Sequence, residues 1–245
     1  MTDYFARRDM VVEFGHILRS PLQGIEGDLA WLTSLLGKVE GGEMMLLACE
    51  RARSHVQEIS RKIRGYVQAT APPKTLGRTF RRVQVEQVAR SVVRSFQAPA
   101  SMKGIRLKVD SQQLRPVTTG LDALELILSN LVDNAVKYSF DNKEVRIRLS
   151  QLNNFLQIEV EDFGLMIPRS EIHHIWDRYY RGTAAVDPRR YRSGTGIGLS
   201  VAKDLVEELG GSINVTCQTA TGTSTSQAGV VRFTVSLPCV SKERI

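Results

Sequence analysis

The chain has 245 residues, of which 42% are hydrophobic and 24% are charged, and its formal net charge is +7. This composition is typical of a folded globular protein with one large domain or two small ones, and it excludes a disordered or fibrous chain. No run approaches the roughly 18 apolar residues of a membrane span, and the N-terminus does not resemble a secretory signal. We therefore expect a cytoplasmic chain; a membrane anchor, if the full-length protein has one, lies outside these residues.

Positive charge is dispersed along the chain except at residues 177–192, where five arginines gather. No nucleic-acid motif accompanies them, so we predict no nucleic-acid binding and favour a small polyanion such as a nucleoside triphosphate. The three cysteines are widely spaced and form no CxxC pair. This spacing argues against a zinc site or a disulfide framework and favours buried, reduced thiols.

Apolar residues recur every three or four positions over residues 11–36 and again over residues 45–66, with a break at residues 37–42. The spacing predicts two amphipathic helices joined as an antiparallel hairpin. A hairpin cannot enclose its own apolar seam, so we expect two copies to pair into a dimeric four-helix bundle. The chain is therefore predicted to be a homodimer.

The first of these helices carries a histidine on the side opposite its apolar seam. His16 lies two residues from both Phe14 and Leu18, which at about 100° per residue turns it outward. Pro21 follows a little more than one turn later, where a kink is expected. A core role for His16 is thereby disfavoured, and the remaining alternatives are an idle surface residue and a reactive one.

A proline pair at residues 72–73 ends the second helix and indicates a linker. We expect a hairpin domain at residues 1–71, a linker at 72–79 and a second domain at 80–245. In that domain, alternating polarity predicts strands and helical spacing predicts helices. The strands are expected at 105–109, 155–160 and 231–237, and the helices at 85–96, 121–138 and 197–209. The predicted fold class is α+β: an α/β sandwich with a mixed, mostly antiparallel sheet.

The helix at residues 121–138 carries a polar stripe beside its packing face, made by Asn130, Asn134 and Lys137. Carboxamide oxygens are hard, neutral ligands suited to Mg²⁺, and a lysine one turn away can meet phosphate oxygens. The alternative for such a stripe is a solvated or capping face.

Two further stretches point to a nucleotide. Residues 193–199 open the next helix with three alternating glycines, which let backbone N–H groups approach phosphates at a helix N-terminus. Asp162 follows the strand at 155–160, so we place a carboxylate at a strand end, where it can accept a hydrogen bond from an adenine amino group.

Five motifs in this order resemble those of the sensor histidine kinases of two-component systems, and the resemblance covers nearly the whole chain. They are His16-x-x-x-Ser20-Pro21-Leu22 (phosphoacceptor box), Asn130-x-x-x-Asn134-Ala135-x-Lys137-Tyr138 (asparagine box), Asp162-x-Gly164 continuing to Ile167 (first glycine box), Ile175-Trp176-Asp177-Arg178-Tyr179-Tyr180-Arg181 (aromatic box) and Gly194-Thr195-Gly196-Ile197-Gly198-Leu199 (second glycine box). The resemblance implies a dimerising hairpin that carries the histidine, joined to an ATP-binding sandwich of the type shared with gyrase, the Hsp90 chaperones and MutL.

The resemblance also implies roles for these residues. Asp162 would read adenine, Asn134 with Asn130 would hold Mg²⁺, and residues 182–193 would form a mobile lid. The remaining nucleotide-binding residues by resemblance are Lys137, Tyr138, Gly164, Ile167, Arg178, Arg181, Gly194, Thr195, Gly196, Ile197, Gly198 and Leu199.

Asn130 separates the kinases from the ATPases among these relatives. The ATP-hydrolysing members carry a glutamate at this position that activates water, whereas a carboxamide takes no proton at neutral pH. A γ-phosphate without activated water is left for another nucleophile, such as a neutral imidazole. We therefore predict ATP-dependent autophosphorylation of His16 and phosphotransfer to an aspartate on a response-regulator receiver domain. The upstream sensor domain or protein is expected outside this chain.

Four positions bear on activity. The residue after the phosphoacceptor is usually acidic in this family but is Ile17 here, and Glu13, at i−3, is our substitute proton acceptor. Ser20, on the face of His16, stands where the family often places the residue that supports phosphatase activity toward the regulator. Met166 replaces the second glycine of the first glycine box. Two alternatives follow: an ATP-binding pseudokinase that signals by conformation, and an ATPase clamp of the gyrase type.

Overall fold

The structure, a computed structural model, describes residues 80–183, 196–219 and 228–239 together with ten positions of the N-terminal region. The chain divides into two compact units, Met1–Pro72 and Pro73–Ile245. In the first unit all ten described positions are helical, and nine of them belong to the predicted apolar seam. They are Ile25, Leu29, Leu32, Thr33, Leu36, Met45, Cys49, Ala52, Val56 and Ile59. The hairpin as a whole and the four-helix bundle lie outside the described residues and remain predictions.

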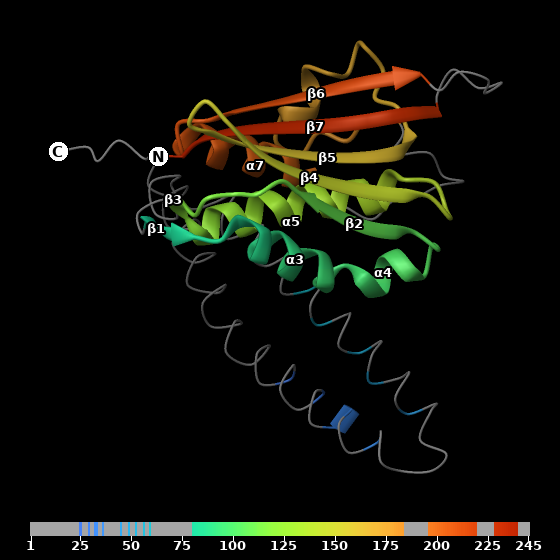
Figure 1. Ribbon diagram of the computed structural model, residues 1–245. Helices are drawn as coiled ribbons and strands as arrows, with labels where there is room; N and C mark the ends of the chain where they lie inside the picture. Colours follow the sequence, from blue (N-terminus) through green and yellow to red (C-terminus); the bar gives the residue numbers. More distant parts are fainter. Residues whose placement is uncertain are drawn as a thin grey trace, which may run out of the picture. The chain divides into compact units, whose positions relative to one another are not determined.

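The second unit contains two sheets and a layer of helices (Figure 1). In chain order its elements are β1 (Phe80–Val83), α3 (Val85–Ser95), α4 (Gln97–Ser101), β2 (Arg106–Ser111), β3 (Val117–Gly120), α5 (Leu121–Tyr138), β4 (Glu144–Leu152), β5 (Phe155–Leu165), the 3₁₀ helix η2 (His174–Trp176), α7 (Gly198–Glu208), β6 (Ser212–Thr219) and β7 (Ala228–Pro238).

The main sheet has five strands in the order β2-β4-β5-β7-β6. β2 pairs with β4 in parallel, and the other three pairings are antiparallel. β1 and β3 form a separate antiparallel pair. The predicted α+β class with a mixed, mostly antiparallel sheet is confirmed. Each predicted strand and helix of this unit is present, and β1, β3, β4 and β6 are strands that the sequence analysis does not predict.

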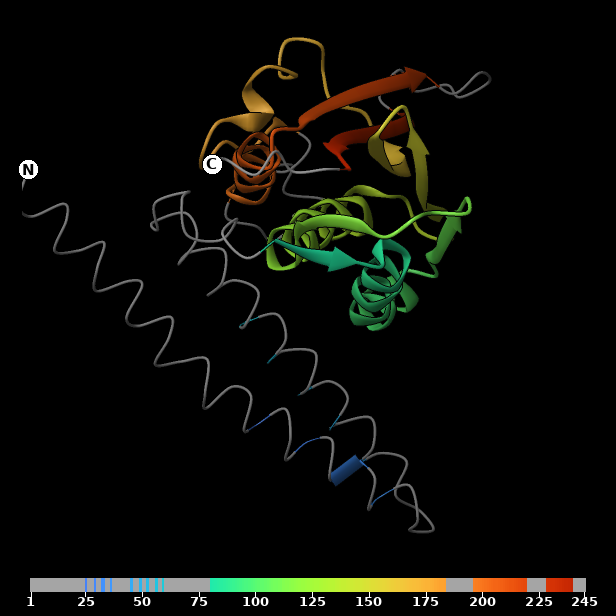
Figure 2. The ribbon, with the colours of Figure 1, turned by 60° about the vertical axis from the view of Figure 1, so that its left-hand side comes forward.

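The helices α3, α5 and α7 cover one face of the main sheet, as Figures 1 and 2 show from two directions. α5 contacts both α3 and α7 as well as β5, so it is the centre of this layer. The core lies between this layer and the sheet. Its largest fully buried side chains are Phe96, Phe233, Leu124, Ile127, Leu128, Leu131, Ile147, Leu149, Leu156, Ile158, Ile197 and Leu237.

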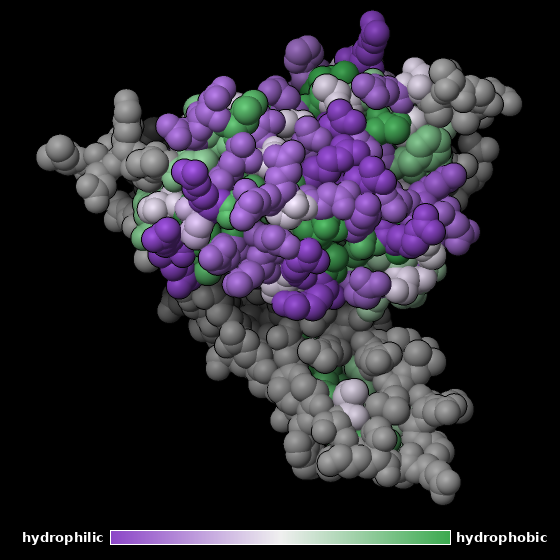
Figure 3. Space-filling model, in the orientation of Figure 1, coloured by the Kyte–Doolittle hydropathy of each residue, from purple (hydrophilic) through white to green (hydrophobic). Residues whose placement is uncertain are grey.

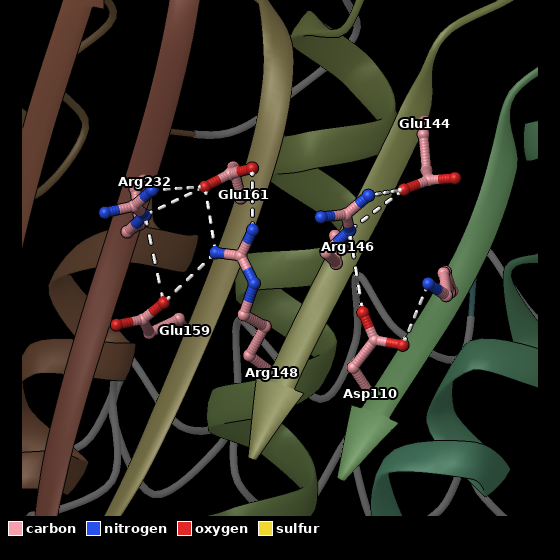
Figure 4. Close-up of polar contacts among 8 residues, drawn as sticks. Asp110, Glu144, Arg146, Arg148, Glu159, Glu161 and Arg232 are labelled. Atoms are coloured by element: carbon pink, nitrogen blue, oxygen red, sulfur yellow. Dashed lines mark hydrogen bonds and ion pairs between the residues drawn. The ribbon is translucent and has the colours of Figure 1, made fainter. Parts of the chain in front are cut away.

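The opposite face of the sheet is polar and carries two groups of ion pairs, one across β2 and β4 and the other across β4, β5 and β7 (Figure 4). Glu161 receives hydrogen bonds from both Arg148, at 3.0 Å, and Arg232, at 2.6 Å. Burial alone would raise the pKa of Glu161, but these two guanidinium groups outweigh it and lower that pKa. The face turned toward the viewer in Figure 3 is accordingly mostly hydrophilic.

The structure bears on two further expectations, one about membrane-spanning helices and one about the cysteines. Among the described residues, no helix is both long and apolar enough to cross a membrane. The three cysteines are free, as expected, but the expectation that they are buried is wrong, because all three are partly exposed. Cys217 lies on the edge strand β6, and Cys239 directly follows the end of β7.

Candidate functional site

α5 supports the polar stripe predicted from the sequence. Its apolar positions recur at helical spacing, no glycine or proline interrupts it, and eight of its residues are buried. Asn130, Asn134 and Lys137 lie at the border of this buried face and are partly exposed. Lys137 donates to Asp133 one turn earlier, with 2.5 Å between Nζ and Oδ2. The lysine proposed for phosphate is thus oriented by a neighbouring carboxylate.

Asn130 faces the start of α7. A Cβ built on Gly198, the first residue of α7, would lie 3.3 Å from Asn130 Oδ1. The asparagine box therefore meets the second glycine box at a helix N-terminus, where backbone N–H groups lack helical partners. Such an end attracts anions because of both the free N–H groups and the helix dipole.

Asp162 is a carboxylate in the interior of the molecule. It pairs with Val231 in the β5–β7 ladder and is 3% exposed. Its Oδ1 has no hydrogen-bond partner among the residues described. Burial raises the pKa of Asp162 well above its usual range, and the positive charge of Lys103 opposes that rise.

The structure corrects one detail of Asp162. The sequence places it at a strand end, whereas β5 continues for three more residues to Leu165. The reason is that β7 pairs with β5 through Gly229 and Ala228, which extends the ladder past the carboxylate. Asp162 thereby lies within the β5–β7 ladder rather than at a free end, although the pairing of β5 with β4 stops one residue earlier, at Glu161.

Gly164 brings the end of α5 against β5. A Cβ at this position would lie 2.1 Å from the carbonyl oxygen of Tyr138 and 2.9 Å from Asp162 Oδ1, so no side chain fits. A bridge between Ser139 and Gly164 and a hydrogen bond from Phe140 N to Phe163 O, at 3.0 Å, hold the two segments together. Tyr138 and Asp162 are therefore neighbours across Gly164.

The aromatic box packs onto β7 and against the second glycine box. Trp176 meets Phe233 edge to face, with ring centroids 6.0 Å apart. Gly196 has a φ of +72°, and a Cβ there would lie 2.7 Å from the backbone of Tyr179 and Tyr180. Only glycine fits this conformation and this contact. Arg178, predicted to bind nucleotide, pairs with Asp204 of α7 at 2.8 Å.

A buried carboxylate holds the segment that follows the aromatic box. Glu171 is 9% exposed. It accepts from the Thr183 hydroxyl at 2.8 Å and from the Thr183 backbone N–H at 3.2 Å. Arg181, predicted to bind phosphate, is partly exposed and lies two residues before Thr183. Glu171 thus fixes the chain directly after that arginine.

Met166 is placed against the sheet. A Cβ built on Gly229 would lie 2.7 Å from the Met166 sulfur, so the side chain packs on the start of β7. Ile167, one residue later, hydrogen-bonds through its backbone to the Cys217 thiol. Burial raises the pKa of Cys217, and the charge of Asp162 adds to that rise. Met166 and Ile167 therefore lie at the same end of the sheet as Asp162.

Of the predicted site residues, the structure brings together those of the asparagine box, both glycine boxes and the aromatic box in the second unit. Five lie outside the described residues: Glu13, His16, Ser20, Gly194 and Thr195. Ile197 is buried and Leu199 is partly exposed at the start of α7. Lys103 and Glu171 lie next to predicted site residues but are not predicted from the sequence, because neither belongs to a recognisable motif.

These residues fit an adenine nucleotide. A buried carboxylate oxygen that has no hydrogen-bond partner among the described residues suits an amino group that donates a hydrogen bond. In the part of the chain described, no group of three or more His, Cys, Asp or Glu side chains could hold a metal ion. The carboxamide oxygens of Asn130 and Asn134, together with phosphate oxygens, are ligands that would suit a divalent cation.

The fold and these residues define a nucleotide-binding α+β sandwich. Residues 120–240 match the histidine kinase-, DNA gyrase B-, and HSP90-like ATPases. The chain belongs to the sensor histidine kinases that contain an ATPase domain of this type.

Curated relatives support this assignment. The signal transduction histidine-protein kinase ArlS of Staphylococcus haemolyticus is 31% identical over 226 residues, which cover 85% of this chain and 45% of ArlS. The sensor histidine kinase YvrG of Bacillus subtilis is 40% identical over 97 residues, covering 40% of this chain and 16% of YvrG. The chain thus spans less than half the length of these relatives.

Solved structures share the fold. Full-length ShkA in complex with AMPPNP has a TM-score of 0.62 at 19% identity and covers 95% of this chain and 46% of its own. The mycobacterial sensor histidine kinase MprB has a TM-score of 0.53 at 22% identity, with 66% of this chain and 100% of its own covered.

Proposed function

We propose that the chain is the kinase core of a two-component sensor: ATP phosphorylates His16, and the phosphoryl group then passes to an aspartate of a response-regulator receiver domain. The observation that carries the proposal is the position of Asn130, which faces the N-terminus of α7 with a carboxamide. A carboxamide cannot activate water as a base, so the site favours transfer over hydrolysis.

The proposal assigns a role to each of the main site residues of the second unit. Asp162 accepts a hydrogen bond from the adenine amino group with Oδ1, which has no partner within the described part of the chain. Lys137 and the N–H groups at the start of α7 bind the phosphates, and Arg181 contributes charge. Tyr138 lies beside the adenine end, against Gly164. Mg²⁺, held by Asn134 with Asn130, would neutralise the triphosphate charge and orient the γ-phosphate.

The proposed transfer step forms one bond, breaks one bond and releases one proton. An unprotonated imidazole nitrogen of His16 forms a bond to the γ-phosphorus, and the bond from that phosphorus to the bridging oxygen breaks, so ADP leaves. The imidazole then loses its remaining N–H proton. Glu13 accepts this proton in our proposal, because Ile17 occupies the position where the family usually has an acid.

We assign partners from the same proposal. The hairpin pairs with a second copy, and a receiver domain docks where phospho-His16 is presented. Ser20, four residues from His16, would hold the water that removes phosphate from the regulator. The match covers 45% of the signal transduction histidine-protein kinase ArlS, so we propose that the sensor corresponds to a part of such a kinase that the match does not cover.

Incubation of the chain with γ-labelled ATP tests the proposal. The expected result is an acid-labile, base-stable label on the wild type and none on His16→Gln, while both bind ADP equally. Nucleotide binding without label on the wild type would instead identify an ATP-binding pseudokinase, which Ile17 and Met166 motivate. Steady phosphate release that persists in His16→Gln would identify an ATPase clamp.

Glu13→Gln tests the proton acceptor separately. Removal of a general base lowers rates by about 10²–10⁴-fold, so autophosphorylation of Glu13→Gln should fall by at least the lower of these factors. Nucleotide affinity should stay the same, because Glu13 belongs to the first unit and the nucleotide residues to the second. An unchanged rate refutes the role of Glu13.

A further inference from the structure

Lys103 binds the C-terminal end of the asparagine-box helix from a distant part of the chain. It lies in the turn between α4 and β2, and its Nζ donates to three backbone carbonyls, those of Val136 at 2.8 Å, Lys137 at 3.2 Å and Ser139 at 2.6 Å. These acceptors are 33 to 36 residues away in sequence. An ammonium group has three N–H donors, which match these three carbonyls in number, and the same Nζ forms an ion pair with Asp141 at 4.0 Å.

The backbone around Lys103 is fixed independently of its side chain. The Lys103 carbonyl accepts from Asn142 N at 2.9 Å, and Ile105 N donates to Ala100 O at 2.9 Å. Gly104 has a φ of +64° and lies directly against Asn142. The side chain itself is only 19% exposed. Its position under α5 is therefore a property of the fold rather than of a free surface lysine.

The contact meets a specific need of α5. The last carbonyls of a helix have no helical partners, and the helix dipole places partial negative charge there. Val136 and Lys137 belong to that last turn. The Lys103 ammonium donates three hydrogen bonds and carries a positive charge. It therefore provides donors for these carbonyls and also stabilises the negative end of the helix dipole.

The same turn forms part of the candidate site. It carries Lys137 and Tyr138, and the Tyr138 carbonyl lies against Gly164 of the first glycine box. The positive charge of Lys103 also acts on the buried Asp162, whose pKa it lowers against the effect of burial. Lys103 thus acts on both sides of the contact between α5 and β5. It holds the end of α5 by hydrogen bonds, and its charge lowers the pKa of Asp162 on β5.

We propose that Lys103 is a positioning residue of the nucleotide site: it holds the last turn of α5 against the end of β5 and supplies the positive charge behind the adenine-reading carboxylate. The proposal rests on the proposed function, because it assigns Lys103 to the site that binds ATP. Lys103 does not touch the nucleotide. Its contribution is to hold Lys137, Tyr138 and Asp162 in their binding positions before the nucleotide binds.

Isothermal titration of the full chain with ADP tests the proposal. Lys103→Met keeps the length of the stem and removes the charge and all three hydrogen bonds, so ADP should bind about 10- to 100-fold more weakly. Lys103→Arg keeps the charge and donors and should recover most of that loss. The matched control is Lys108→Met, whose ammonium lies on the opposite face of the sheet in an ion pair with Asp110, at 3.1 Å; it should bind ADP like the wild type.

Kinetics separate positioning from general damage to the fold. In autophosphorylation, Lys103→Met should raise KM for ATP by a factor similar to its change in Kd, with a much smaller change in kcat. Lys103→Gln, which retains two amide donors without the charge, gives a second variant should Lys103→Met fail to fold. Wild-type affinity in Lys103→Met or Lys103→Gln overturns the proposal, as does equal loss in Lys103→Arg. A wild type that binds no ADP overturns the proposed function itself.

Discussion

Asp162 combines two features that reduce the stability of an unliganded protein. It is a buried carboxylate, and its Oδ1 has no hydrogen-bond partner among the described residues. Buried polar atoms without partners destabilise the folded state unless a ligand completes them. We infer that Asp162 lowers the free energy of unfolding of the unliganded protein and in return provides an acceptor for an amino group of the ligand.

The stability cost of Asp162 should depend on pH. Burial raises its pKa in the folded state, so the folded protein holds the proton more tightly than the unfolded chain does. The contribution of Asp162 to stability is therefore largest below its unfolded pKa of about 3.9 and decreases as pH rises toward its folded pKa. Thermal unfolding from pH 4 upward should show Asp162→Asn gaining stability relative to the wild type.

Glu161, the neighbour of Asp162, provides a control with the opposite sign. Its pKa is lowered in the folded state by Arg148 and Arg232, despite its partial burial. Its stabilising contribution is present above its unfolded pKa of about 4.3 and is lost as pH falls through its folded pKa. Glu161→Gln should therefore lose stability relative to the wild type at neutral pH and approach it in acid. Parallel curves for all three proteins would contradict both assignments.

Met166 is a second residue whose contacts bear on its role, because it can pack on the sheet or contact the nucleotide. Its sulfur packs on Gly229, so its substitution should affect the sheet more than the nucleotide. Met166→Gly removes that contact and adds backbone freedom, which should destabilise the domain by about 1–2 kcal/mol. The ADP affinity should change by less than about threefold. A tenfold change in Kd, in either direction, would place the methionine on the adenine ring.

At the scale of elements, periodicity accounts for what the sequence predicts. The spacing of apolar residues predicts α5 at 121–138, and the structure has the same bounds. β1 and β3 have four residues each, which is too short for alternation to stand out. The contacts of Lys103 and Glu171 connect residues that no period relates, so they follow from the folded arrangement alone.

The segment after the aromatic box should depend on Glu171. Glu171 Oε1 accepts from both the hydroxyl and the backbone N–H of Thr183. Glu171→Ala should destabilise the domain by about 1 kcal/mol, because both donors lose a partly buried acceptor. Glu171→Gln retains the Oε1 acceptor and should be close to the wild type. Denaturant unfolding measures both values.

A double-mutant cycle shows whether this effect belongs to the contact. Thr183→Val removes the hydroxyl donor, so Glu171→Ala and Thr183→Val should combine to less than the sum of their separate effects, by roughly 0.5 kcal/mol or more. Additive effects would mean that Glu171 acts through other neighbours. In that case its bond to Thr183 would not position the chain next to Arg181.

At the scale of the whole molecule, part of the apolar seam of the first unit is exposed in a single chain. Four of its described residues remain substantially exposed in a single chain: Ile25 (45%), Leu32 (39%), Met45 (63%) and Ile59 (48%). Burying a large apolar side chain fully contributes about 1.5–3 kcal/mol, so these residues can contribute several kcal/mol to association. This exposure supports the proposed homodimer.

Charges on the seam should separate the two copies without affecting the second unit. Leu32→Glu combined with Ile59→Glu places two carboxylates where the copies would meet, so sedimentation should show a monomer in place of the wild-type dimer. ADP should bind as before, because the nucleotide residues belong to the separate unit Pro73–Ile245.

Ser54→Glu gives the matched control for this experiment. Ser54 lies two residues from both Ala52 and Val56 in the sequence, and this spacing predicts a position on the side of the helix opposite the predicted seam. It adds a carboxylate to the same helix as Ile59→Glu and should leave the dimer intact. If Ser54→Glu dissociates the copies as fully as the seam variant does, general charge repulsion explains the effect. If neither does, the copies associate through another surface, and the exposed seam needs a different partner.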